Sequence, residues 1–148
     1  SSGRWGFGID GTYVIDLKYQ EEKGQPWENL VGKYEDPAIV RWKHVANLNW
    51  AYEGWKMVFE QEFVRGYHDQ NMTSRPQFNN HKVPDYTLYN FSTTYTGFKN
   101  LSLTAGIKNM IDEDPAASNV VDNFQIGYDP RYSDPTGRTY FVRGTYNF

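Results

Sequence analysis

Acidic side chains occur at two places with spacing that could support chemistry. Glu60 and Glu62 resemble a carboxylate pair for acid-base catalysis, and Asp112-Glu113-Asp114 could suggest a calcium site. On a strand, however, residues i and i+2 lie on the same face, so the glutamates belong to one polar wall beside Lys56. The acidic triplet lacks the spaced ligands and the glycine of a calcium loop. We interpret it as a solvated loop tip.

The histidines do not have the spacing of metal ligands. His44, His68 and His81 are never at the short separations of a zinc site, and the chain has no cysteine. A nucleophile elbow and a phosphate-binding glycine loop are also missing from the sequence. We therefore predict no catalytic residue, no cofactor and no bound metal, and we do not expect an enzyme.

A polar loop from His68 to Pro84 is the best candidate for contact with a ligand. Its charged and amide side chains could bind a small polar molecule from outside, although an ordinary exposed loop has the same composition. The candidate residues in and beside this loop are Arg65, His68, Asp69, Gln70, Asn71, Arg75 and His81.

Composition excludes two classes of protein. Aromatic residues make up 18% of the 148 residues, yet mean hydropathy is -0.77. No stretch approaches the roughly 20 apolar residues of a membrane-spanning helix. The net charge is -3 and the 15 basic residues are scattered, so the basic stripe of a nucleic-acid-binding protein is missing. Abundant aromatic residues with low hydropathy fit a transmembrane β-barrel or a sugar-binding β domain.

Alternation of apolar and polar residues predicts six β-strands. The clearest spans residues 4–20 and would be roughly 55 Å long at about 3.3 Å per residue. Long polar connections alternate with short ones such as Glu53-Gly54, as in bacterial outer-membrane barrels. The predicted strands are residues 4–20, 38–52, 55–67, 86–96, 101–108 and 138–148.

Each predicted strand has one apolar, aromatic face and one polar face. The apolar face could cover a soluble core or meet lipid, and the length of the strands favours lipid. We expect lipid contact for Trp5, Phe7, Ile9, Tyr13, Trp42, Trp50, Phe59, Phe63, Tyr140 and Tyr146. We expect Arg4, Asp10, Asp16, Lys56, Glu60 and Arg143 to line the lumen.

Six strands are too few to close a barrel of this kind, which needs about eight or more. An open sheet would leave two edges unpaired, which is untenable in lipid because backbone groups there need hydrogen-bond partners. We therefore predict an all-β chain that is the C-terminal portion of a larger transmembrane antiparallel barrel.

Residues 101–115 resemble the penultimate strand and following loop of TonB-dependent outer-membrane receptors. That family has a hydrophobic strand followed by an Asn, an Asp and a Pro, which match Asn109, Asp112 and Pro115. The segment before the last strand is similar too, with Gly127, Tyr128, Asp129 and Pro130, then Gly137 and Arg138. We interpret these residues as turn and cap residues, because Asn, Asp and Pro shape loop backbone.

The resemblance implies that residues 1–148 are the last six strands of a barrel of about 22 strands in the bacterial outer membrane. A plug domain, absent here, would carry the contact with the inner-membrane TonB complex. The receptor would import a scarce nutrient such as a siderophore, a vitamin or an oligosaccharide. Its other implied partners are outer-membrane lipid and the barrel-assembly machinery, which would read Phe148, Tyr146 and Tyr140 as a C-terminal signal.

A soluble β domain is the alternative interpretation. An aromatic-rich β-sandwich or small barrel that binds carbohydrate or a lipophilic ligand would have similar composition. It would need an internal core, and its outward face would be the polar one.

Overall fold

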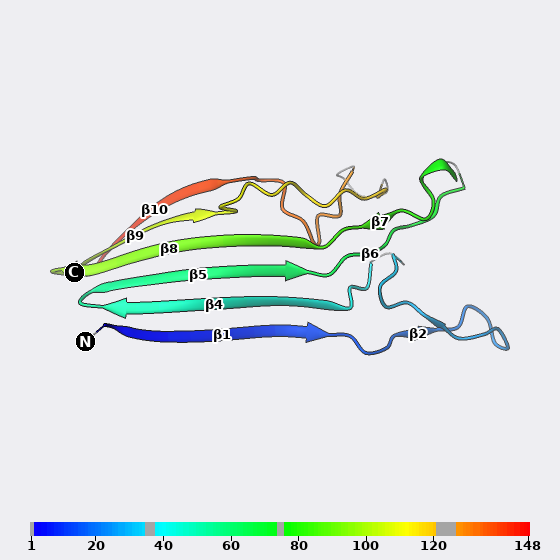
Figure 1. Ribbon diagram of the computed structural model, residues 1–148, viewed down its shortest axis with the longest axis horizontal. Coiled ribbons are helices and arrows are strands. Elements are labelled where there is room, and N and C mark those ends of the chain that lie inside the picture. Colours follow the sequence, from blue (N-terminus) through cyan, green and yellow to red (C-terminus); the bar gives the residue numbers. More distant parts are fainter. Residues whose placement is uncertain (1, 35–37, 74–75, 121–126) are drawn as a thin grey trace.

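Six long strands form one open antiparallel sheet in the computed structural model, which describes all residues except 1, 35–37, 74–75 and 121–126 (Figure 1). Their order is β1-β4-β5-β8-β9-β10, so each strand pairs with its neighbour in the chain. The two outer strands, β1 and β10, each pair on one side. The six strands are β1 (Arg4–Tyr13), β4 (Trp42–Tyr52), β5 (Trp55–Val64), β8 (Tyr86–Phe98), β9 (Leu101–Lys108) and β10 (Thr139–Tyr146).

Two short ribbons and one helical turn belong to the loops. The ribbons pair β2 (Lys18–Tyr19) with β3 (Glu28–Asn29) and β6 (Tyr67–His68) with β7 (Lys82–Val83). A single 3-10 turn, η1, spans Pro76–Phe78. Among the described residues, no helix has the length and apolar character needed to cross a membrane.

The number and order of the strands agree with the sequence, but the first three predicted strands extend too far toward the loops, and the last, predicted over residues 138–148, is Thr139–Tyr146. The strand predicted over residues 4–20 ends at Tyr13, and at about 3.3 Å per residue it runs roughly 33 Å. Just beyond the end of β1, the Val14 N–H donates to the Arg41 carbonyl at 2.9 Å and Arg41 Nη1 donates to the Ile15 carbonyl at 3.4 Å, and the two segments then separate. Asp16 therefore lies beyond the sheet, beside Lys18 at 2.9 Å, and its predicted place in the lumen wall was wrong.

The other two overlong strands end where the chain turns into buried loops. β4 begins at Trp42 rather than at residue 38, and β5 ends at Val64 rather than at residue 67. Continued alternation in the predicted strands of residues 38–52 and 55–67 would place Val40 and Tyr67 on the apolar face of the sheet. They are instead 6% and 5% exposed inside packed loops, where burial removes their apolar surface from water.

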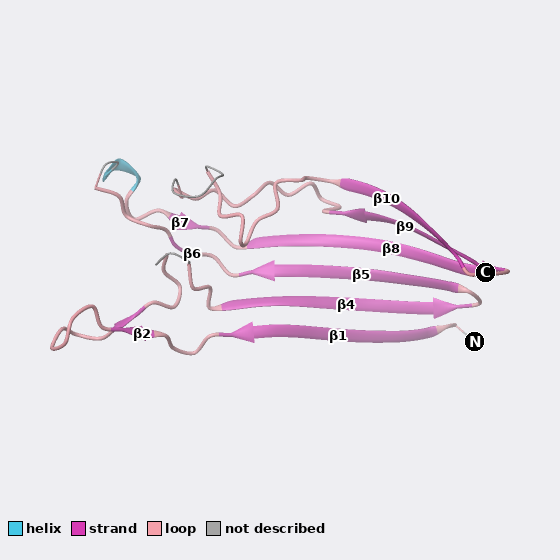
Figure 2. Cartoon of the chain, turned by 180° about the vertical axis from the view of Figure 1, so that it is seen from behind, coloured by secondary structure: helices cyan, strands magenta, loops and turns pink. Residues whose placement is uncertain are grey.

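Short turns and long loops lie at opposite ends of the sheet (Figure 2). Glu53 and Gly54 both have positive φ, 43° and 86°, as a two-residue hairpin turn requires. Asn100, with φ 59°, supports the second turn. Both chain termini lie at the end with the short turns, and the three long loops, residues 14–41, 65–85 and 109–138, extend from the other end.

The sheet has one exposed apolar face and one polar face. The register places Trp5 opposite Trp50 and Trp50 opposite Met57, whereas Asp10 lies opposite Val45 on the other face. The apolar side chains have no layer packed over them, and Phe7 is 72% exposed. The exposed residues of this face are Trp5, Phe7, Ile9, Tyr13, Leu48, Phe59, Leu103, Tyr140, Val142 and Tyr146.

Aromatic rings gather at both ends of the apolar face. Tyr13 and Trp42 pair near the loops, with ring centroids 6.4 Å apart, and Trp5 and Trp50 pair near the turns at 6.3 Å. Eight residues separate Trp42 from Trp50, or roughly 26 Å along a strand. An apolar band of about 25 Å between two aromatic girdles is the pattern of a membrane-facing barrel wall.

The buried apolar core of the described chain lies in the loops rather than in the sheet. It combines residues from all three long loops with the adjoining ends of the strands, so the loops fold onto one another. We call it the loop core, and it consists of Tyr34, Ala38, Val40, Tyr67, Val83, Tyr86, Ala116 and Val120.

Candidate functional site

Two neighbouring hollows lie between the polar face of the sheet and the loop of residues 109–138. Their volumes are about 400 and 440 Å³, within the range of small-ligand pockets, and both are lined by Glu62, Leu88 and Asp134. The first also reaches Lys43, Tyr86 and Arg131, and the second reaches Glu60, Asn90 and Lys108. The mixed lining offers hydrogen bonds and both signs of charge to a polar molecule.

An asparagine fixes the two wall glutamates. The side-chain amide of Asn90 donates to Glu60 Oε1 at 3.1 Å and to Glu62 Oε1 at 2.7 Å. The glutamates lie on one wall, as the sequence predicted, and share a donor. One shared donor therefore holds both carboxylates in place, which is not the arrangement of separate acid and base groups.

Asn109 joins this wall to the loop. It is 4% exposed and has φ 50°, and its N–H donates to Asn90 Oδ1 at 3.0 Å. Its side chain accepts from the Glu113 N–H at 2.8 Å and donates to the Glu113 carbonyl at 2.9 Å. One side chain thus closes the first turn of the loop.

Asp112 holds the start of this loop to its end. Its Oδ1 accepts from the Arg138 N–H at 2.7 Å, and both Asp112 and Gly137 have positive φ, 60° and 68°. A Cβ on Gly137 would lie 3.3 Å from the same carboxylate oxygen. Four residues of the family motif therefore meet at the base of the loop, with Pro115 half-buried nearby in sequence. Their contacts are structural.

Asp129 anchors the second half of the motif. It is 1% exposed and accepts three bonds from Arg131, from the main-chain N–H at 3.0 Å, Nε at 2.8 Å and Nη2 at 2.9 Å. These bonds raise the pKa of Arg131 above its ordinary value. The guanidinium lies 5.7 Å from the Tyr34 ring centroid, so Arg131 reaches across to the first loop.

The other residues of the second family segment, Gly127, Tyr128 and Pro130, contact the loop of residues 109–138 or line the first hollow. The Gly127 carbonyl accepts from the Ser118 N–H at 2.9 Å, and Tyr128 bridges to Ala117. Pro130 lines the first hollow. The segment between Val120 and Gly127 lies outside the described residues.

The candidate residues of the second loop separate into two groups. Asp69 and His81 meet, with His81 Nδ1 3.0 Å from Asp69 Oδ2, but the Asp69 side chain is completely buried. Arg65 lies apart, paired with Asp85 at 2.8 Å on the surface. His68 is exposed and its N–H donates to the Gly32 carbonyl at 2.8 Å.

Three further candidates complete this set. The Gln70 amide donates to the Asn119 carbonyl at 2.9 Å, and Asn71 Oδ1 accepts from the Asn80 N–H at 2.8 Å. Arg75 lies outside the described residues. The structure therefore gives Asp69, Gln70 and Asn71 roles in holding loop backbone and leaves part of His81 open to solvent.

Sequence reasoning missed several residues of the hollows, because strand alternation marks Lys43, Asn90 and Lys108 only as polar-face positions. Asp134 was also missed, because it belongs to no motif recognised in the sequence. Hydrogen bonds from Thr136 lower the pKa of Asp134 below its ordinary value, so the carboxylate stays charged in the hollow. Tyr132 also lines the first hollow, and burial raises the pKa of its hydroxyl.

A chain of polar side chains crosses the apolar face near the loops. Trp42 Nε1 donates to His44 Nδ1 at 2.8 Å, His44 Nε2 lies 3.3 Å from Gln61 Oε1, and the Gln61 amide donates to the Tyr89 hydroxyl at 3.2 Å. Since Nδ1 accepts, Nε2 carries the proton. The chain satisfies polar groups beside the aromatic girdle, and both nitrogens of His44 are occupied.

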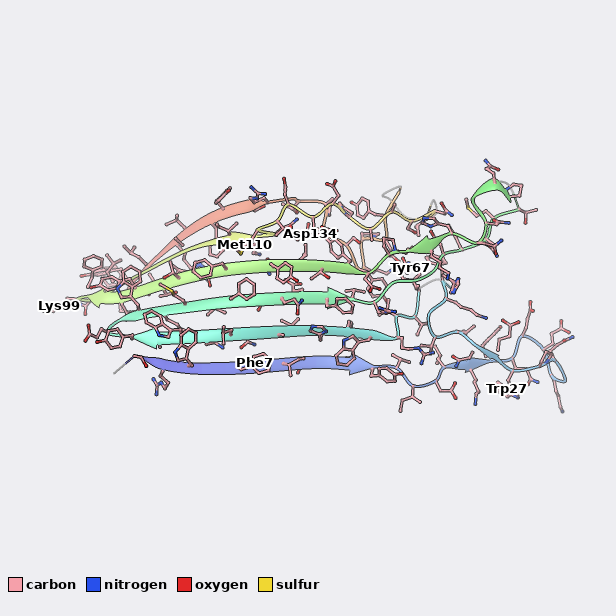
Figure 3. All side chains as sticks on the ribbon, viewed as in Figure 1. Phe7, Trp27, Tyr67, Lys99, Met110 and Asp134 are labelled. Atoms are coloured by element: carbon pink, nitrogen blue, oxygen red, sulfur yellow. The ribbon has the colours of Figure 1, made fainter. Side chains whose placement is uncertain are left out.

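Tyr67, which is labelled in Figure 3, and Tyr86 are equally buried, at 5% and 4% exposure, but their hydroxyls differ in hydrogen bonding. The Tyr67 hydroxyl makes no hydrogen bond of normal geometry, and burial and the nearby Asp129 raise its pKa, although Ser118 close by offsets part of the rise. The Tyr86 hydroxyl donates to the Asp134 carbonyl at 3.2 Å and accepts from the Asp134 N–H at 3.3 Å. Of these two tyrosines, Tyr86 is therefore the one whose hydroxyl joins a strand to the loop of residues 109–138.

We therefore expect Tyr67→Phe to leave stability unchanged or raise it slightly. Removing a buried, unpaired hydroxyl relieves a desolvation cost. Tyr86→Phe should cost about 1 kcal/mol, because it leaves two loop groups without their partner. Urea titration of the two variants side by side measures the difference. A larger loss in Tyr67→Phe than in Tyr86→Phe would contradict this account of the loop core.

The C-terminal strand presents its aromatic residues to the outside. Tyr140 and Tyr146 are 68% and 55% exposed, and the Tyr146 and Phe148 rings lie 5.2 Å apart. The Asn147 N–H still donates to the Asn100 carbonyl at 2.9 Å. The three predicted assembly residues thus share one accessible face.

Comparison with known proteins gives a family model and a solved structure. The family model described as "TonB dependent receptor-like, beta-barrel" matches residues 1–110. No curated protein matches the chain. A crystal structure of a mutant ferric enterobactin receptor (PfeA) from Pseudomonas aeruginosa is similar, with a TM-score of 0.63 and 20% sequence identity. The match covers 97% of this chain and 20% of that receptor, so this chain spans about a fifth of its length.

Proposed function

We propose an outer-membrane transport function for this chain, because it belongs to the family of TonB-dependent receptor β-barrels. Members of this family lie in the bacterial outer membrane and are transporters rather than enzymes. We propose that residues 1–148 form the last six strands and three outer loops of such a barrel. In this proposal, a plug domain and the remaining strands would come from parts of the protein outside this sequence.

The exposed apolar face of the sheet carries this proposal. A soluble β domain would bury its aromatic residues, yet Phe7 and Val142 are 72% and 81% exposed. Burying such a face in lipid removes it from water, while the polar face lines an aqueous lumen. The same observation argues against the alternative of a soluble sugar-binding domain, which needs a core inside its sheet.

The proposed transport is TonB-coupled uptake of a scarce nutrient such as a siderophore, a vitamin or an oligosaccharide. The similar solved receptor is named for ferric enterobactin, and at 20% identity that likeness supports the fold. The linings of the two hollows support a polar ligand, since Lys43 and Arg131 join aromatic rings in the first and Lys108 and Asn90 line the second, with Glu62 in both. We propose that the ligand contacts the inner wall and the loops above it.

Uptake by cells that carry the full-length receptor tests this function. The ligand panel consists of ferric enterobactin, cobalamin and a maltooligosaccharide, each radiolabelled. We expect one of these classes to accumulate only when both the receptor and TonB are present. Accumulation that is independent of TonB, or recovery of the receptor in the soluble fraction, would contradict the proposal.

We also propose that Phe148, with Tyr146 and Tyr140, is the signal read by the barrel-assembly machinery. Phe148→Ala should lower the amount of receptor assembled in the outer membrane several-fold, because the terminal strand is presented for strand addition. Asn147→Ala is the matched control, since it keeps the main-chain bond to Asn100. The amount of heat-modifiable receptor in membrane fractions is the measurement. Equal amounts in the two variants would rule out this role.

A further inference from the structure

The second and third loops meet at a single buried carboxylate. The Asp69 side chain has no exposed surface. Its Oδ1 accepts from the Gln70 N–H at 2.9 Å and the Ser118 hydroxyl at 3.1 Å. Its Oδ2 accepts from the Asn119 N–H at 2.6 Å and lies 3.0 Å from His81 Nδ1. Two of these four partners belong to the third loop.

Neighbouring bonds reinforce the same junction. The Asp69 N–H donates to the His81 carbonyl at 3.0 Å, which joins the two sides of the second loop. The Gln70 amide donates to the Asn119 carbonyl at 2.9 Å. Apolar contacts alone would let the loops slide, whereas these directional bonds define one relative position.

We propose that Asp69 is a latch that joins the loops of residues 65–85 and 109–138 into one preformed ligand-facing unit. Asp69 acts as a positioning residue, because its carboxylate is enclosed and contacts loop groups rather than the hollows. The third loop covers both hollows, so its position decides their shape. This inference rests on the proposed function for its consequence in ligand binding, but the latch itself is a property of the loops.

The negative carboxylate is essential to this arrangement because every partner can donate. In Asp69→Asn, one end of the side chain becomes an NH₂ group that faces an N–H or O–H donor. Buried donors that face each other leave hydrogen bonds unmade, so the loops should separate. Asp85→Asn is the matched control. Asp85 is an exposed carboxylate of the second loop that bonds Arg65 and the Gly66 N–H, both in the same loop.

The first test measures the distance between the loops in the full-length receptor, without ligand. Spin labels are placed on cysteines introduced at Thr73 and Asp114, two exposed positions on the two loops. Electron-electron resonance should give one narrow distance distribution in the parent and in Asp85→Asn. In Asp69→Asn the distribution should be about twofold broader or more, because local opening becomes favourable. An Asp69→Asn distribution as narrow as that of Asp85→Asn overturns the latch.

The second test separates positioning from direct contact with ligand. Asp69→Asn should weaken binding of the transported member of the ligand panel about tenfold if the joined arrangement is populated a tenth of the time. Cross-linking the two loops with a short bis-maleimide between cysteines at Gln70 and Asn119 should restore the affinity. Weakened binding that the cross-link does not restore would assign Asp69 to direct contact and overturn the positioning role.

Failure of the two proposals can be told apart. If no panel member is transported, but Asp69→Asn still broadens the distance distribution, the proposed function fails and the latch stands. If transport occurs and the distribution does not change, the latch fails and the function stands.

Discussion

Replacing Ile9 by arginine should lower the free energy of unfolding of the full-length barrel in a bilayer by about 2–4 kcal/mol. Ile9 lies midway between Trp5 and Tyr13 on the apolar face and is 58% exposed. A guanidinium there would enter the centre of the hydrocarbon layer, where charged side chains are costly. Urea titration of the receptor folded in lipid vesicles measures the loss.

Val45→Arg is the matched control for this prediction. Val45 pairs with Asp10, the residue next to Ile9, so the two substitutions lie at nearly the same depth on opposite faces. The new guanidinium would lie beside Asp10 and Glu62, its register neighbours on the polar face. We expect little change. Equal losses at both positions would mean that neither face meets lipid, and a larger loss at Val45 would reverse the assignment of faces.

Replacing Gly106 by valine should destabilise the barrel by about 1–3 kcal/mol or prevent its assembly. A Cβ at Gly106 would lie 2.5 Å from Phe141 Cζ and 2.8 Å from the Phe91 carbonyl oxygen. The ring could turn away, but the carbonyl belongs to the neighbouring strand and cannot. Phe141, the aromatic residue on the polar face of β10, covers the bare glycine, a known way of stabilising a sheet. Urea titration and heat-modifiable mobility report the effect.

Gly144→Val on the adjoining strand is the control. Its Cβ would meet only Leu103 Cδ2, at 3.6 Å, and would point to the apolar face. Valine favours strands and lipid contact, so this variant should be as stable as the parent or more stable. The double variant Gly106→Ala/Phe141→Ala removes the contact with the ring but keeps the contact with the Phe91 carbonyl. It should therefore recover only part of the stability that Gly106→Val loses. Full stability of Gly106→Val would show that β8 and β9 are not paired in this register.

The two faces of the sheet followed from the sequence alone. Strand side chains alternate with a period of two, so residues such as Phe7 and Lys56 could be assigned to opposite faces before any pairing was known. The strand ends could not be assigned in this way. Alternation continues in residues 14–20 and at Val40 and Tyr67, but pairing needs a partner strand, and the partners turn away into the loops.

Only part of the candidate site could be predicted from the sequence. Family resemblance marked Asn109, Asp112 and Arg138 but did not indicate that Asp112 reaches across the loop to the Arg138 main chain. Asp69 was expected to face a ligand as one of several polar loop residues. Its partners Ser118 and Asn119 are 49 and 50 residues away, and no local pattern predicts such a contact.

The sequence by itself determined the six-stranded, two-faced sheet with long connections at one end and short ones at the other. These features depend on contacts between strands that follow one another in the chain, so local alternation and turn residues specify them. Only the tertiary structure decided that the loops pack into the loop core, that Asp69 joins two of them, and that the hollows lie beneath the third. Those features arise from burial and hydrogen bonding between distant segments, and their free energy depends on which groups meet rather than on any period in the chain.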